Sequence, residues 1–293
     1  MEIVMQRKRR NRMFLLFSAT VFILFSLPLY SLIRFALGDD TFTYIPLIPL
    51  VSAYFFWENR KEIFSGRDEW YPIGGALIAG AIILYIYGAI QAGRLSENTH
   101  LTVMSLSLVA CWIGGVLFFY GPGTWRAGAF PLVFLIFMIP IPGMILDPIV
   151  SMLQRGSAEV SYGLFRMIGV PVYRDGFLFN LPGLTIEVAK QCSGIRSSLS
   201  LLLISIITGH IFLKRGWSKG ILCFSVVPIT IFKNGVRIVS LSLLAAYVDR
   251  RIFESELHRS GGIIIFGLAL LLFGGVFWAV KKAERRKTSN AAS

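Results

Sequence analysis

The chain has 293 residues, of which 55% are hydrophobic and 15% are charged. Soluble domains carry about 25% charged residues, so this composition excludes an ordinary soluble domain. Apolar runs of about 20 residues recur along the whole sequence, which predicts an all-α polytopic membrane protein. The formal net charge of +13 comes largely from short cationic blocks at the ends of these runs. Cations at such positions set membrane topology and do not indicate nucleic-acid binding.

Eight apolar segments are predicted to be transmembrane spans. They cover residues 13–33, 41–57, 72–91, 99–120, 129–152, 194–213, 220–247 and 262–280. The first is longer than a signal-peptide core, so we expect a retained membrane anchor. The fifth contains Pro140 and Pro142, which remove backbone donors and kink a helix, so it is a candidate for a broken or re-entrant span.

The eight spans are expected to form a single integral membrane domain. It would comprise a four-span part at residues 1–128, a part with the candidate functional residues at residues 129–280, and a basic tail at residues 281–293. Cationic blocks precede the first span and follow the last one, so we expect both termini in the cytoplasm. Two longer segments, residues 156–193 and 248–261, would then face the outside of the cell.

The first of these outer segments has its own expected structure. Residues 158–170 carry apolar side chains in a pattern compatible with an interfacial helix. Residues 172–179 and 184–188 are rich in β-branched and aromatic side chains and flank a Pro182-Gly183 turn, which predicts a β-hairpin. Because hairpin edges need hydrogen-bond partners, the hairpin should lie at the membrane surface and lead directly into Cys192.

Cys192 and Arg196 are the first candidate functional residues. In a helix they would lie one turn apart, where a guanidinium favours a thiolate. The alternative is that Cys192 is a small residue at a helix start and Arg196 is an interfacial anchor. Cys111 and Cys223 lie within apolar runs and are expected to be packing residues. Three cysteines without paired spacing indicate neither a disulfide framework nor a zinc site.

Two further candidate positions follow in the last two spans. Asn234 and Arg237 share a helical face, and an arginine within a span costs a few kcal/mol unless it faces a polar partner or cavity. An internal structural pair involving Arg237 is the alternative. His258 precedes the eighth span and could transfer protons near neutral pH. The other two histidines, His100 and His210, are weaker candidates, since Cys192, Arg237 and His258 all map to the outer leaflet.

Three segments in this order, residues 191–197, 232–238 and 257–262, resemble the signature blocks of the exosortase/archaeosortase family. Residues 169–176 and 181–183 also resemble that family, and the likeness covers residues 131–280. The resemblance implies a membrane cysteine protease or transpeptidase. Such an enzyme recognises a C-terminal sorting signal on exported proteins, cleaves it, and transfers the new C-terminus to an acceptor.

The resemblance implies a role for each matching residue. Cys192 would be the nucleophile, Arg237 the basic partner and His258 the acid/base. Substrate-binding or oxyanion support is expected from Arg196, Asn234, Ser193 and Glu187. Many relatives have a carboxylate directly before the cysteine, whereas this chain has Gln191, and Glu187 is the nearest upstream acid.

The implied partners are exported proteins with a C-terminal motif, a transmembrane helix and a basic tail, together with membrane lipid and an amine or hydroxyl acceptor. Nucleic acid is not expected, and neither is a metal or an organic cofactor, because no ligand cluster or phosphate-binding glycine loop is evident. Two alternatives stay open. A purely hydrolytic membrane cysteine protease would use the same residues. A transporter or a scaffold for surface polysaccharide assembly would tolerate Cys192→Ala and would favour inverted repeats, which are not evident.

Overall fold

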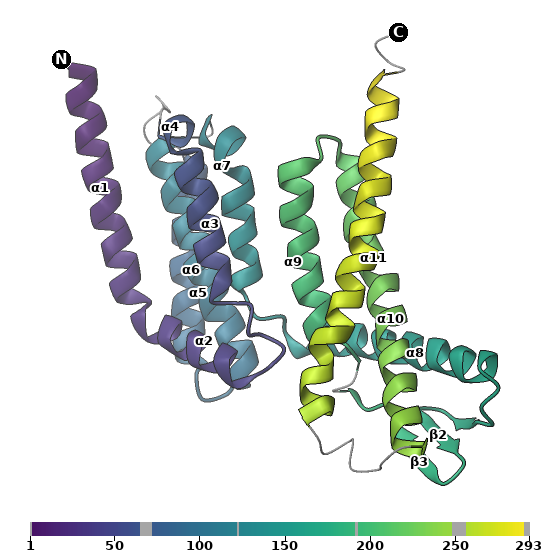
Figure 1. Cartoon of the computed structure of the whole chain (residues 1–293). Helices are drawn as coiled ribbons and strands as arrows, with labels where there is room; N and C mark the ends of the chain where they lie inside the picture. The colour runs from purple at the N-terminus through teal and green to yellow at the C-terminus, as the bar shows by residue number, and fades with distance from the viewer. Residues whose placement is uncertain (1, 65–71, 122, 191–192, 248–255, 290–293) are drawn as a thin grey trace. The chain divides into compact units, whose positions relative to one another are not determined.

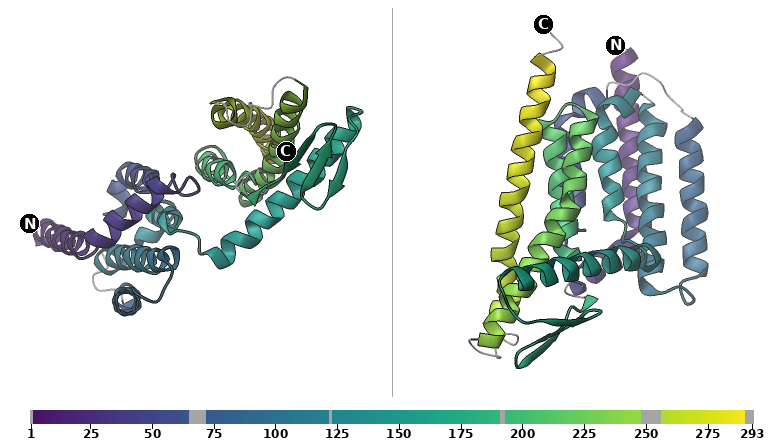
Figure 2. Two further views of the ribbon diagram at one scale, coloured as in Figure 1. Left: turned by 90° about the horizontal axis from the view of Figure 1, so that it is seen from below. Right: turned by 90° about the vertical axis from the view of Figure 1, so that its right-hand side faces the viewer.

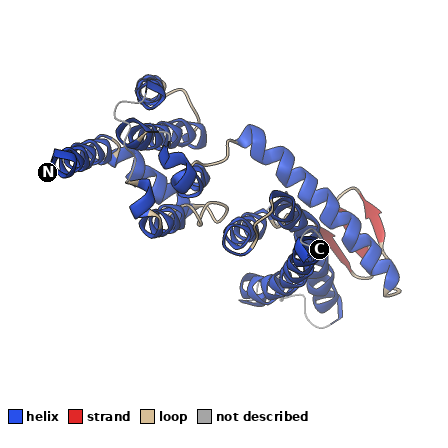
Figure 3. Ribbon diagram, turned by 90° about the horizontal axis from the view of Figure 1, so that it is seen from above, coloured by secondary structure: helices blue, strands red, loops and turns tan. Residues whose placement is uncertain are grey.

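The computed structural model describes residues 2–64, 72–121, 123–190, 193–247 and 256–289. For residues 2–4, 126, 256–263 and 288–289 it describes the backbone and not the side chains. The chain divides into two compact units, Met1–Ile145 and Leu146–Ser293 (Figure 1). Almost all of the described secondary structure is helical, and the strands are confined to the second unit (Figure 3).

The first unit is built entirely from helices in its described part. They are α1 (Glu2–Leu24), α2 (Ser26–Gly38), α3 (Leu47–Glu58), α4 (Arg60–Ile63), α5 (Pro72–Ile90), α6 (Glu97–Tyr120), α7 (Gly123–Phe134) and the 3-10 helix η1 (Leu135–Met138). Helices α5 and α6 pack closely because Gly74 has no side chain. A Cβ atom there would lie 2.4 Å from the backbone nitrogen of Phe118. Small residues of this kind allow membrane helices to approach each other.

The predicted interruption of the fifth span is confirmed. Helix η1 ends at Met138, and α8 (Gly143–Met167) begins after Pro142. The carbonyls freed by this break have partners on α6: Asn98 Nδ2 donates to the Ile141 carbonyl at 3.1 Å, and Thr102 Oγ1 donates to the Pro140 carbonyl at 3.0 Å. Non-helical backbone at membrane depth is tolerated when protein groups satisfy it in this way.

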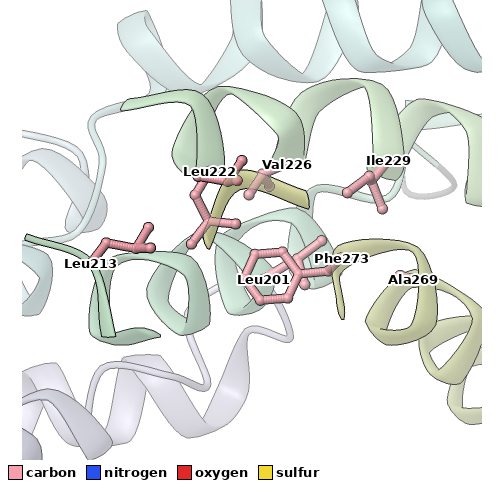
Figure 4. Packing of buried hydrophobic residues seen from close by; sticks show 8 residues of the cluster. Leu201, Leu213, Leu222, Val226, Ile229, Ala269 and Phe273 are labelled. Carbon is pink, nitrogen blue, oxygen red and sulfur yellow. The ribbon is translucent and has the colours of Figure 1, made fainter. Parts of the chain in front are cut away.

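The second unit contains four long helices and a small sheet. After α8 come β1 (Tyr173–Asp175), β2 (Leu178–Leu181), β3 (Leu184–Glu187), α9 (Ile195–Phe212), α10 (Gly216–Tyr247) and α11 (Glu256–Ser289). Helices α9, α10 and α11 lie side by side in both views of Figure 2. Their shared core includes Leu201 from α9, Leu222 and Val226 from α10, and Phe273 from α11 (Figure 4).

The predicted β-hairpin is confirmed and has one more strand than expected. The three strands are antiparallel in the order β1-β2-β3, and Phe179 lies opposite Ile186. The expected first arm is split because Gly176, at φ 57°, allows an additional turn between β1 and β2. The sheet packs on α8 through Phe165 and Phe179, whose ring centroids are 5.9 Å apart. The expected interfacial helix at residues 158–170 forms most of the C-terminal half of α8 and is continuous with it.

Each of the eight predicted spans overlaps a helix, but the helices differ in length. Among the described residues, five helices are long and apolar enough to cross a membrane by themselves, and up to seven spans result if two bent helix pairs each count as one. Eight had been expected. The second predicted span, residues 41–57, is helical only over the 12 residues Leu47–Glu58. Its first residues form turns instead, in which the Asp39 side chain accepts a hydrogen bond from the Thr41 backbone nitrogen at 2.8 Å.

Candidate functional site

Helix α10 has a polar face, formed by Lys233 and Asn234, that is buried in the interior of the second unit. Lys233 is 4% exposed, and Asn234 has no exposed surface. Gly235, the next residue, is also buried. Buried polar and charged side chains are costly unless they are hydrogen-bonded, so the partners of this face decide its function. Arg237, one turn further along α10, is half-buried.

Helix α8 supplies the first set of partners. Asn234 Nδ2 donates a hydrogen bond of 3.0 Å to Ser157 Oγ. Ser161 Oγ donates to the Ser157 carbonyl at 2.7 Å and to the Gly235 carbonyl at 3.4 Å. The two helices touch at Gly235, where a Cβ atom would lie only 2.6 Å from Val160 Cγ1. The position of α8 is therefore tied to the buried face of α10.

The turn that precedes α9 packs on the same face of α10. Ser193 is fully buried, and its backbone nitrogen donates to the Lys190 carbonyl at 3.1 Å. Gly194 follows at φ 84°, a conformation that favours glycine. A Cβ atom at Gly194 would lie 3.4 Å from both Thr230 Cγ2 and Asn234 Cγ. The structure thus places the Ser193–Gly194 turn against Asn234.

Two hydroxyls of this cluster have unused hydrogen-bonding capacity. Ser193 Oγ and Thr230 Oγ1 are buried and have no hydrogen-bond partner among the described residues. Both side chains have no exposed surface. Buried polar atoms normally have a partner, and those that lack one often mark a functional site.

Lys233 joins α10 to the first turn of α9. Its Nζ donates to Ser197 Oγ, and Ser197 Oγ donates in turn to the Gly194 carbonyl at 2.9 Å. Arg237, a second basic residue, lies one helical turn from Lys233 on α10. In the described ranges, no carboxylate lies within 4 Å of Lys233. This face of α10 is consequently electropositive, an environment that favours thiolates and developing oxyanions.

The other predicted site residues are placed differently. Arg196 is exposed in the first turn of α9, and Glu187 is exposed at the end of β3. Cys192 lies outside the described residues. His258 belongs to the first turn of α11, but its side chain lies outside the described part of the chain. The structure packs Gly194, the residue after Ser193, against Asn234 and places Arg237 on the same helix as Asn234.

Sequence reasoning did not select Lys233, Ser197, Ser157 or Thr230. The sequence signal for Lys233 was its position beside Asn234 in an apolar span. Ser157 and Ser161 are one turn apart, but such serines are common on amphipathic helices and carry no specific signal. Across the described ranges, no group of three or more histidine, cysteine, aspartate or glutamate residues could hold a metal ion.

The fold and this polar face define the class of the protein: a polytopic helical membrane protein with a buried, electropositive cluster. The family model for transmembrane exosortases matches residues 33–275, well over half of the chain, so the chain belongs to the transmembrane exosortase family. Membership implies a sortase-like membrane transpeptidase of the cysteine type in general terms. No curated protein and no solved structure matches the chain significantly.

Proposed function

We propose that the chain cleaves C-terminal sorting signals of exported proteins at the outer face of the bacterial cytoplasmic membrane and transfers the new C-terminus to an amine or hydroxyl acceptor. The observation that carries this proposal is the packing of the Ser193–Gly194 turn on the buried polar face of α10. Ser193 directly follows Cys192 in the sequence. The sequence adjacency of Cys192 to this turn supports a nucleophile close to the face formed by Lys233 and Arg237.

In the proposed reaction, the Cys192 thiolate attacks the scissile carbonyl carbon and forms a tetrahedral intermediate. Its collapse breaks the peptide bond and leaves a thioester, while the departing amine takes a proton from His258. The acceptor amine or hydroxyl then attacks the thioester, loses its proton to His258 and releases the thiolate. Arg237 and Asn234, with Arg196, stabilise the negative oxygen of the intermediates.

The chemistry of the α10 face supports these roles. A cation close to a thiol favours the ionised nucleophile, and a fixed donor costs no reorganisation when charge develops on the substrate oxygen. The bond from Asn234 to Ser157 keeps the amide in one orientation. Ser193 and Glu187 would contact the substrate peptide, Ser193 from inside the cluster and Glu187 from the exposed end of β3.

The proposed substrate is an exported protein with a short C-terminal motif, a transmembrane helix and a basic tail. The apolar transmembrane helix of the substrate would enter from the lipid between the helices of the enzyme, where packing between helices contributes to selectivity. Cationic blocks at residues 7–12 and 281–287 support cytoplasmic termini and an outward-facing site.

Co-expression with a candidate substrate tagged at both ends tests this function. Cys192→Ala, Arg237→Gln and His258→Gln should each abolish the shift in substrate size. Cys111→Ala and Cys223→Ala are matched controls and should retain processing, because Cys111 is buried and Cys223 half-buried as free thiols elsewhere in the chain. Mass spectrometry of the product terminus separates transfer from hydrolysis. Normal processing by folded Cys192→Ala protein would disprove the proposal.

A further inference from the structure

One end of the α9–α11 bundle carries a dense array of cations. Residues 212–219 and 277–287 contain eight lysines and arginines and a single acidic residue, Glu284. The cations are Lys214, Arg215, Lys219, Lys281, Lys282, Arg285, Arg286 and Lys287. These two segments meet in the fold, since Lys281 Nζ lies 5.0 Å from the ring centroid of Phe212 at the end of α9.

The one carboxylate of the array is turned inward. Glu284 is buried, and its Oε1 accepts hydrogen bonds from the backbone nitrogens of Lys214 at 3.1 Å and Arg215 at 2.6 Å. It holds the end of α11 against the α9–α10 loop. Five of the eight cations, by contrast, are exposed: Lys214, Lys282, Arg285, Arg286 and Lys287.

Three of the lysines are held over aromatic rings. Lys281 Nζ lies over Phe212 and also 5.4 Å from the Phe277 centroid, Lys282 Nζ lies 4.7 Å from Trp278, and Lys287 Nζ lies 4.9 Å from Trp217. Within the described part of the chain, none of the three has a carboxylate within 4 Å. A ring contact orients an ammonium group but leaves N–H donors for an anion.

Two buried donors at the start of α10 lie in the same corner of the fold. Trp217 Nε1 and Ser218 Oγ have no hydrogen-bond partner among the described residues, and Ser218 has no exposed surface. The first turn of a helix also carries backbone N–H groups and a partial positive charge, which favour anions. The Glu284 carboxylate lies at this helix start, where it accepts from the backbone nitrogens of Lys214 and Arg215, so the start of α10 already faces an anion of the chain itself.

The exposed surface next to these cations is apolar, which points to a lipid and not to a free anion. Leu271 is 76% exposed and Trp278 is 64% exposed. They are two turns apart on one side of α11, and Lys282 continues the same stripe one turn later. The order along the helix is aliphatic, aromatic and cationic. This matches the order of acyl chain, glycerol region and phosphate in a phospholipid.

We propose that this corner binds the headgroup of an anionic glycerophospholipid. Three exposed cations on the same side of α11 as Trp278, namely Lys282, Arg285 and Arg286, hold the phosphate, and the acyl chains lie along Trp278 and Leu271. The site is independent of the proposed peptidase chemistry, because none of its residues belongs to the α10 polar face.

Native mass spectrometry of the full chain in detergent tests the site with phosphatidylglycerol and phosphatidylcholine of equal chain length. The variant Lys282→Gln/Arg285→Gln/Arg286→Gln should bind phosphatidylglycerol about 100-fold more weakly, since each cation near a headgroup contributes about 1 kcal/mol. Its binding of phosphatidylcholine should not change. The matched control Arg34→Gln/Arg94→Gln/Arg166→Gln removes three exposed cations elsewhere and should bind like the unmodified chain.

Three outcomes would overturn the proposal. They are equal binding of the two lipids by the unmodified chain, equal loss of binding in the control variant, and displacement of phosphatidylglycerol by millimolar inorganic phosphate, which would indicate a free-phosphate site. Trp278→Ala provides a second test that does not depend on three simultaneous changes. Its side chain is largely exposed, so the fold should persist while phosphatidylglycerol affinity falls several-fold.

Discussion

Asn234, which has no exposed surface, donates a 3.0 Å hydrogen bond through its side-chain nitrogen to Ser157 Oγ. This bond joins the middle of α10 to α8 through two residues that are 77 positions apart in the chain. Because the amide is already oriented by Ser157, Asn234 is a fixed dipole beside the Ser193–Gly194 turn. Its orientation therefore depends on the position of α8 as well as on α10.

The coupling between Asn234 and Ser157 should be measurable. Ser157→Ala leaves a buried amide donor without its partner, so we expect a loss of about 1 kcal/mol of stability. Asn234→Ala should cost more, and the double variant should cost less than the sum of the two. Unfolding by SDS in mixed micelles gives these values. Thr20→Ala, which removes an exposed intrahelical bond, should change stability by less than about 0.5 kcal/mol. If Ser157→Ala and Asn234→Ala lowered stability additively in the double variant, the two residues would not be coupled.

Gly235 should tolerate no larger residue while Val160 is present. A Cβ atom at Gly235 would lie 2.6 Å from Val160 Cγ1, so Gly235→Ala should separate α8 from α10 and lower stability by about 1–3 kcal/mol. Gly235→Ala/Val160→Ala should recover most of that loss because the space is restored. Gly267→Ala is the control, since a Cβ atom there meets nothing within 4 Å. Thermal unfolding in detergent measures all three variants, and failure of Val160→Ala to rescue would argue against a steric cause.

Gly194 should be required for its backbone conformation. At φ 84° an alanine is strained by about 1–2 kcal/mol, and its Cβ would press on Thr230 and Asn234. Gly194→Ala should therefore lower stability and, under the proposed function, substrate processing. Gly194→Asn should lose less stability, since asparagine adopts this conformation more readily. Gly163→Ala, in α8 with no neighbour within 4 Å of the added Cβ, should be neutral or stabilising.

Lys233 should matter for activity more than for folding. Methionine has a similar length, and replacing a buried cation with an apolar side chain is often neutral or stabilising. Ser197 would keep its bond to the Gly194 carbonyl. We therefore expect Lys233→Met to fold normally but to process substrate at least tenfold more slowly, because the α10 face loses positive charge. Lys61→Met, at an exposed position in the first unit, is the control. Normal processing by Lys233→Met would show that the charge is dispensable.

Local features of the chain were predictable from the sequence because they depend on neighbouring residues. Pro140 and Pro142 indicated the break in the fifth span, since proline removes a backbone donor wherever the helix would pass. Pro182-Gly183 indicated the turn between β2 and β3 because proline and glycine favour turn conformations of the backbone. The helical length of the second predicted span was overestimated because hydropathy does not show that residues 41–46 form turns before α3 begins.

The sequence by itself determined that the chain is a helical membrane protein, where its apolar segments lie and which family its three polar blocks resemble, because hydropathy and motifs are properties of contiguous residues. Only the tertiary structure decided that Asn234 meets Ser157, that Lys233 meets Ser197, and that Gly194 packs against both Thr230 and Asn234. These contacts join distant segments. They depend on which faces of α8, α9 and α10 turn towards each other, and helix packing sets that orientation.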